Sequence, residues 1–151
     1  MKFKKLAALA CGMTILSSSM VAFATVPTEK IGVGHVSPGM RVADLLATAG
    51  QPEAKIGDNW YYINYKVEVD KKDNPNIVEE VSSRNPTLGS TGGVKIGQEA
   101  AVLNLAYGKA DRVQTMGNVE EYDYFNHEYT RKMTFTVLNG VIVKIECELI
   151  D

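Results

Sequence analysis

Cysteine, histidine and net charge are all scarce in this sequence. Its 151 residues include two Cys and two His, and the formal net charge is −2. Only Cys147 lies outside the N-terminal apolar run, so no intramolecular disulfide is predicted once that run is removed. His35 and His127 have no partner at metal-ligand spacing, so no metal or cofactor is predicted. Nucleic-acid binding is excluded because the chain lacks the basic excess that it requires.

The single long apolar run lies at the N-terminus and is typical of a secretory signal peptide. Basic residues precede the apolar stretch 6–24, which ends in Ala22-Phe23-Ala24, the small-x-small pattern that signal peptidase cleaves. We therefore predict a signal peptide over 1–24, cleaved before Thr25. A membrane-spanning helix or a lipid anchor on Cys11 are the alternatives. We expect a secreted or periplasmic protein with no stable membrane anchor after cleavage.

Two segments of the remaining chain resemble each other and predict an internal repeat. The segment 36–52 can be laid over 94–110 without a gap, so that Leu45 meets Leu103 and both glycine positions coincide. We divide the chain into a first repeat over 25–82, a linker over 83–93 that is rich in Gly, Ser and Pro, and a second repeat over 94–151.

Each repeat is predicted to contain a short helix followed by strands. The helices are indicated by apolar stripes, namely Val42, Leu45, Leu46 and Ala49 in the first copy and Val102, Leu103, Ala106 and Tyr107 in the second. The dipeptide Asn139-Gly140 predicts a hairpin turn, and the alternation after it buries Cys147 within a strand. The predicted class is α+β: two tandem helix-strand-hairpin repeats that form an antiparallel sheet with short helices on one face.

The same features resemble a known group of extracytoplasmic proteins. They are the segment 39–52, the aromatic run Trp60-Tyr61-Tyr62 and the closing Ile142-Val143-Lys144-Ile145. The pattern resembles the superfamily of the tandem β-lactamase inhibitory protein (BLIP-like) and the small outer-membrane assembly lipoprotein (SmpA/OmlA-like). The resemblance implies an α+β fold whose sheet or loops engage another protein without catalysis. No contact residue of the inhibitor can be matched to a position here.

Candidate catalytic groups are few, so no enzyme and no catalytic residue is predicted. Glu121 and Asp123 share one face of a predicted strand and could shift each other's pKa. An active site would require these carboxylates and His127 to meet within hydrogen-bond reach, and we expect that they do not.

Aromatic side chains are the predicted protein-binding residues. The candidates are Trp60, Tyr61, Tyr62, Tyr65, Phe125 and Tyr129. If Trp60 and Tyr62 face the helices, Tyr61, Tyr65 and Phe125 point to the uncovered face of the sheet. If the parity is reversed, Trp60 and Tyr62 take that face. Either arrangement leaves several rings uncovered.

The predicted function is that of an exported, non-catalytic protein-binding or inhibitor-like module. Its partner would be another extracytoplasmic protein, bound on an aromatic face of the sheet. The alternatives are a cell-envelope assembly or structural factor and a small-molecule-binding module. A deep pocket between the sheet and the helices would favour a small ligand, whereas a broad, shallow aromatic face would favour a protein.

Overall fold

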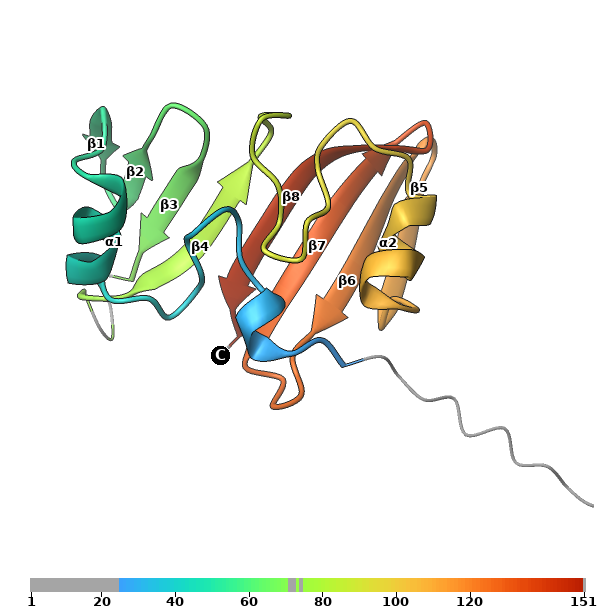
Figure 1. The fold of residues 1–151 in the computed structure, drawn as a ribbon, viewed down its shortest axis with the longest axis horizontal. Helices are drawn as coiled ribbons and strands as arrows, with labels where there is room; N and C mark the ends of the chain where they lie inside the picture. The colour runs from blue at the N-terminus through green and yellow to red at the C-terminus, as the bar shows by residue number, and fades with distance from the viewer. Residues whose placement is uncertain (1–24, 71–72, 74, 151) are drawn as a thin grey trace, which may run out of the picture.

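Eight antiparallel strands form a sheet in the order β1-β2-β3-β4-β8-β7-β6-β5 (Figure 1). The computed structural model describes residues 25–70, 73 and 75–150, so the predicted signal peptide, 1–24, lies outside the described residues. The strands are β1 (Ala54–Ile56), β2 (Asn59–Tyr61), β3 (Lys66–Val69), β4 (Val78–Ser83), β5 (Arg112–Met116), β6 (Val119–Phe125), β7 (Arg131–Leu138) and β8 (Val141–Leu149).

Both α-helices lie on the same face of this sheet, one near each end. Figure 1 shows α1 (Val42–Ala49) beside β1 and β2, and α2 (Ala101–Tyr107) beside β5 and β6. The segments 25–41, which holds the short 3₁₀ helix η1 (Thr28–Lys30), and 84–100 cross the sheet between the two helices. We call this side the covered face and the other side the open face.

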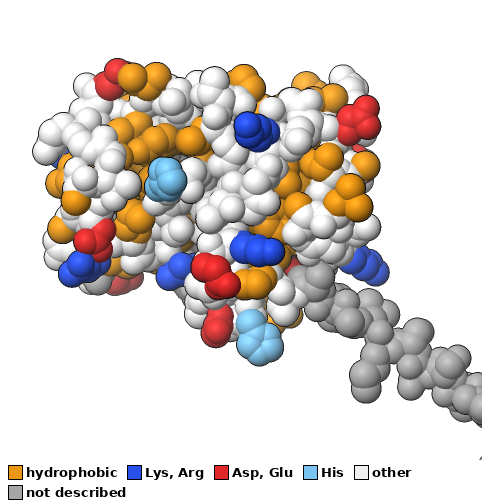
Figure 2. All heavy atoms as spheres, viewed as in Figure 1, with side chains coloured by type: hydrophobic (Ala, Val, Ile, Leu, Met, Phe, Trp, Pro, Cys, Tyr) orange, Lys and Arg blue, Asp and Glu red, His pale blue; other side chains and the backbone are white. Residues whose placement is uncertain are grey.

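The hydrophobic core fills the space between the sheet and the layer over the covered face. Leu45 and Leu103 enter it from the two helices, and Ile31 and Val94 enter it from the two crossing segments. Phe135 of β7 is also completely buried there. Strand alternation explains why one face is apolar, because successive side chains point to opposite sides of the sheet. In Figure 2, hydrophobic side chains reach the surface of this layer in separate patches over both ends of the sheet.

The two helices form where the apolar stripes predict them, and both end in the same way. Gly50 caps α1 with φ 74° and ψ −163°, and Gly108 caps α2 with φ 78° and ψ −160°. A positive φ of this size favours glycine, which has no Cβ to clash with the backbone. The prediction of a short helix at each apolar stripe is therefore confirmed.

The predicted α+β class is wrong, because the chain is mostly β. Its α-helices have only eight and seven residues, against eight strands in the sheet. The prediction missed β1 and β5, which pair with β2 and β6 around Gly57 and Gly117. All residues of both strands are exposed. Such a strand has no apolar–polar alternation to reveal it, since neither face is buried.

The hairpin between β7 and β8 forms at Asn139-Gly140, where the sequence predicts it. Asn139 and Gly140 both have positive φ, 50° and 81°, which is the backbone that a two-residue turn of this kind requires.

Cys147 of β8 is a free cysteine with no exposed surface. Its burial was predicted, and it raises the pKa of the thiol far above the usual value. The described chain contains no helix long and apolar enough to cross a membrane.

The segment predicted as a linker packs against α2. The Ser90 hydroxyl lies 2.6 Å from the Tyr107 hydroxyl, which also accepts a hydrogen bond from the Gly92 amide at 3.1 Å. A Cβ on Gly92 would lie only 2.2 Å from that tyrosine oxygen, so the backbone approaches the ring as closely as glycine allows. The division of the chain into two repeats and a linker stays a prediction.

Candidate functional site

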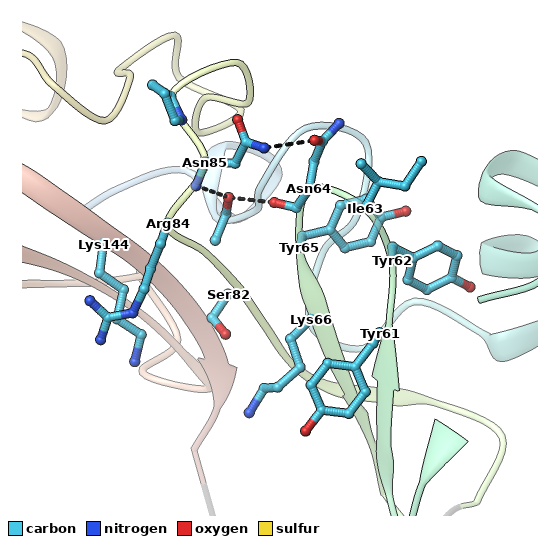
Figure 3. A pocket seen from close by; sticks show the side chains of 12 residues that line it. Tyr61, Tyr62, Ile63, Asn64, Tyr65, Lys66, Ser82, Arg84, Asn85 and Lys144 are labelled. Atoms are coloured by element: carbon cyan, nitrogen blue, oxygen red, sulfur yellow. Dashed lines mark hydrogen bonds between the residues drawn. The ribbon is translucent and has the colours of Figure 1, made fainter. Parts of the chain in front are cut away.

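An open groove of ≈ 640 Å³ lies where the turn between β2 and β3 faces the end of β4 and a residue of β8. Residues far apart in sequence meet there because β4 pairs with β8. The lining consists of Tyr61, Tyr62, Ile63, Asn64 and Tyr65 on one side, Lys66 and Ser82 along the floor, and Ser83, Arg84, Asn85, Pro86 and Lys144 on the other. We call this site the groove (Figure 3).

The aromatic side of the groove combines two exposed apolar side chains with a partly buried support. Tyr61 is 39% exposed and Ile63 is 77% exposed. Behind them the rings of Tyr62 and Tyr65 stack with centroids 4.7 Å apart. The Tyr62 hydroxyl donates a 3.2 Å hydrogen bond to the carbonyl of Gly50 at the end of α1. The exposed pair therefore rests on a wall that is anchored to the helix.

Tyr65 does not point to the open face as the first parity assignment expected. The Tyr62 amide donates to the Tyr65 carbonyl at 2.9 Å, so the two residues lie opposite each other across the turn. Opposed residues share a face of the sheet, which puts Tyr65 on the covered side with Val67. Burial raises the pKa of both tyrosines, so their hydroxyls stay protonated at neutral pH.

The basic side of the groove is formed by Arg84 and Lys144. Ser83 pairs with Ile145, which places Arg84 and Lys144 next to each other across the β4–β8 border. Figure 3 shows their side chains together on one side, with Lys66 and Tyr61 on the other. Lys144 contacts Glu146, whereas no hydrogen bond or ion pair holds Arg84 within the described part of the chain.

Hydrogen bonds between the two sides fix the shape of the groove. The Ser83 hydroxyl donates to the Asn64 carbonyl at 2.7 Å, and the Asn85 side-chain amide donates to Asn64 Oδ1 at 2.8 Å. The Asn85 backbone amide in turn donates to Ser83 Oγ at 3.1 Å. These bonds tie the β2–β3 turn to the segment after β4, so the walls are held before any partner binds.

The other three predicted binding residues lie outside the groove. Trp60 faces the covered side, where the Lys55 ammonium lies 3.7 Å from the centre of its ring. Phe125 and Tyr129 contact each other near the β6–β7 turn, with ring centroids 5.7 Å apart. The structure therefore brings together Tyr61, Tyr62 and Tyr65 only.

The open face carries charge ladders in place of the broad aromatic surface that was expected. Lys66 lies 3.2 Å from Glu80, and Lys132 lies 2.5 Å from Glu148. Burial, followed by the neighbouring Glu146 charge, raises the pKa of Glu80 above its usual value. The reason is alternation, since polar and charged residues occupy the open-face positions of the central strands.

The candidate catalytic carboxylates do not converge with His127. Asp123 is 1% exposed, and Arg112 Nε donates to its Oδ2 at 2.6 Å while Thr134 Oγ1 donates to its Oδ1 at 2.7 Å. Glu121 lies between Gln114 and Thr136 in the sheet register, and His127 is exposed in the β6–β7 turn. Within the described residues no group of three or more His, Cys, Asp or Glu side chains is placed to hold a metal ion.

Two smaller hollows adjoin the helices. One of ≈ 110 Å³ lies between the end of α1 and Leu88 and includes Tyr65 and His35. The other, of ≈ 300 Å³, lies between α2 and Tyr122. The hollow at the end of α1 is below the roughly 300–1,000 Å³ that small-molecule sites occupy, and the hollow beside α2 lies at the lower limit of that range.

Sequence reasoning missed the residues that give the groove its floor and its charge. Ser82, Arg84 and Lys144 were not among the predicted binding residues, because each is ordinary in its local context. The available signal was Ser82-Ser83 at the end of the strand, where two small side chains leave space between longer neighbours. Only the pairing of β4 with β8 shows which side chains flank that space.

No family model matches the chain, and no curated protein matches it in sequence. Among solved structures, it is similar to a DUF4309 family protein (YjgB) of Bacillus subtilis, with 18% identity, a TM-score of 0.51, and coverage of 78% of this chain and 81% of that chain. This likeness shows a shared fold.

Two further solved structures are similar over half of their own length. One is an extracellular protein containing an SCP domain from Bacillus anthracis, with 10% identity, a TM-score of 0.48, and coverage of 98% of this chain and 49% of that chain. The other is a cysteine-rich secretory protein from Staphylococcus aureus, with 14% identity, a TM-score of 0.46, and coverage of 84% and 49%. None of the three is named as an inhibitory protein or an assembly lipoprotein, so that resemblance stays a prediction.

Proposed function

We propose that this chain is an exported, non-catalytic protein-binding or inhibitor-like module, secreted or periplasmic, whose contact surface is the groove. The observation that carries the proposal is the exposed pair Tyr61 and Ile63 on a wall braced by Tyr62, next to basic side chains. Aromatic and arginine side chains are the types that anchor protein interfaces. Export rests on the signal-like segment 1–24.

The shape of the site supports a protein partner over a small ligand. The hollow at the end of α1 measures only ≈ 110 Å³, and the hollow beside α2 measures ≈ 300 Å³, which is the lower limit for small-molecule sites. The groove is open and has exposed apolar edges, so a bound molecule would stay in contact with solvent along its length. An extended segment or a loop of another protein fits such a site, and the hydrogen-bonded walls lower the ordering cost of binding.

The test is affinity capture from the native extracytoplasmic fraction with two matched double variants. Tyr61→Ala with Ile63→Ala removes the exposed apolar pair of the groove. Leu105→Ala with Met116→Ala removes two apolar side chains that are 87% and 61% exposed but lie outside it. Both variants remove only exposed side chains, so both should fold as the wild type does.

We expect the groove variant to lose a specific captured protein by at least about tenfold, which corresponds to about 1.4 kcal/mol. The control variant should retain it. The captured protein is then purified, and its dissociation constant is measured by titration calorimetry against all three forms. Equal recovery of every captured protein by the wild type and the groove variant would show that the groove is not the contact surface.

A further inference from the structure

The floor of the groove contains a serine whose hydroxyl has no hydrogen-bond partner among the described residues. Ser82 lies between Lys66 of β3 and Glu146 of β8 in the sheet register and is 8% exposed. Its side chain is shorter than those of its neighbours, which creates the depression. In the described part of the chain, the Ser82 hydroxyl takes part in no hydrogen bond. The Ser82 oxygen is not among the fully buried side-chain atoms that lack a partner, so it is open to the groove, and a ligand there can bond to it in place of water.

Of the basic side chains that line the groove, all but one have an acidic partner. Lys66 lies 3.2 Å from Glu80 and 3.8 Å from Glu68, and Lys144 contacts Glu146. Among the described residues Arg84 has no such acidic neighbour, and no Asp or Glu lines the groove. The groove therefore presents one guanidinium without a counter-ion, in a protein whose formal net charge is −2.

Arg84 and Ser82 can act on the same group. They lie two residues apart at the end of β4 and face the same side, so their backbones are about 7 Å apart. A carboxylate placed between them would pair with the guanidinium and accept a hydrogen bond from the serine hydroxyl. Guanidinium and carboxylate groups match in charge and planar geometry, which makes this pairing stronger than one between neutral groups.

We infer that the groove recognises an acidic peptide segment of its partner. One carboxylate of the segment pairs with Arg84 and accepts a hydrogen bond from Ser82, while a neighbouring apolar side chain lies against Tyr61 and Ile63. The charge complementarity at Arg84 decides in favour of an acidic segment over a neutral one, and the Ser82 hydroxyl supplies a second donor to its carboxylate. This inference deepens the proposed function and rests on it.

The first experiment selects ligands from a displayed library of random twelve-residue peptides on the purified protein. We expect the selected peptides to be enriched in Asp or Glu next to an aromatic or aliphatic residue. The best peptide and its counterpart with Gln or Asn in place of each acid are then compared by fluorescence anisotropy. The acidic form should bind at least about tenfold more tightly, and added salt should weaken only that form.

Variants of single residues assign this preference to the groove. Arg84→Gln should weaken the acidic peptide by about tenfold or more and leave the amide counterpart unchanged. Ser82→Ala should weaken the acidic peptide several-fold. Lys109→Gln is the matched control, because it removes one exposed positive charge outside the groove. It should have little effect.

The outcomes separate this inference from the proposed function. If Arg84→Gln leaves the acidic peptide unaffected, or if neutral peptides are selected, acid recognition is overturned while apolar protein binding stands. If the library yields no binder at all, the inference is also overturned. If the Tyr61 and Ile63 variant still captures every native partner, the proposed function itself fails, and any peptide affinity of the groove has no part in it.

Discussion

In the first half of the molecule, α1 with β1 to β4, the Gly39 amide donates to the Val78 carbonyl at 2.7 Å. In the second half, α2 with β5 to β8, the Gly97 amide donates to the Ile142 carbonyl at 2.8 Å. The match continues at the far end of each helix. The Tyr62 hydroxyl bonds to the carbonyl of Gly50 at 3.2 Å, and the Tyr124 hydroxyl bonds to that of Gly108 at 3.2 Å. The backbone contacts that attach each helix to its strands are therefore alike.

The halves differ in the lengths of their strands. The first half has strands of three, three, four and six residues, and the second has strands of five, seven, eight and nine. Because β2 and β3 are short, the turn between them begins early and leaves Ile63 exposed. This turn forms the aromatic side of the groove, to which the second half contributes Lys144. Binding surfaces commonly occur where irregular backbone is held by a regular scaffold.

The halves also differ at one register position on the open face. In the first half Tyr61 lies opposite Ala54, and in the second half Asp123 lies opposite Arg112. The second pair is a buried carboxylate with a guanidinium, while the tyrosine remains open to solvent. The same position therefore serves the stability of one half and the proposed binding surface of the other.

The strongest test of this comparison is truncation of the two buried helix leucines. Leu45→Ala and Leu103→Ala should each lower the free energy of unfolding by about 3 kcal/mol, because both side chains are at most 1% exposed. Urea denaturation measures the change. Leu105→Ala, on an 87% exposed residue of α2, should shift it by less than about 0.5 kcal/mol. If either buried leucine behaved like Leu105, the halves would not be held in the same way.

The second test addresses the register position that differs. Arg112→Met should lower the free energy of unfolding by about 2 kcal/mol, because Asp123 would keep only its bond from Thr134. Tyr61→Ala should cost only about 0.5 kcal/mol, since that ring is 39% exposed. The double variant Arg112→Met with Asp123→Leu should recover much of the loss. Equal costs for Arg112→Met and Tyr61→Ala would remove the distinction drawn here.

The smallest effect concerns the two tyrosine hydroxyls. Tyr124→Phe should cost about 1 kcal/mol and Tyr62→Phe less than that, because the Tyr124 bond is the more buried of the two. Thermal unfolding at neutral pH measures the difference. A larger loss for Tyr62→Phe than for Tyr124→Phe would contradict this ranking.

A pH series sharpens the same test. Burial raises the pKa of Tyr124 from 10.0 to about 12. The unfolded chain would ionise this group at lower pH than the folded chain does, so the wild type should lose stability as the pH rises from 10 towards 12. Tyr124→Phe should make this loss shallower, and the remainder comes from groups such as Tyr107 and Cys147, whose pKa burial also raises.

Local patterns were enough to locate the helices and the last hairpin. The stripe around Leu45 and the glycine at position 50 act within ten residues of each other, and Asn139-Gly140 determines its own turn. Tyr61 could be predicted as a binding residue for the same reason, since strand alternation is local. The other groove residues Ser82, Arg84 and Lys144 could not be predicted, because they meet only through the long-range pairing of β4 with β8. The class was wrong because exposed edge strands such as β5 carry no pattern.

The strand order has a consequence for synthesis of the chain. The last strand, β8, lies at the centre of the sheet, between β4 and β7. Until 141–149 are in place, no strand joins β4 to β7, and the groove lacks Lys144. The two halves of the sheet can therefore join only after this segment has been synthesised. Deletion of 141–149 would break the sheet in its middle, whereas losing β1 would remove only an edge.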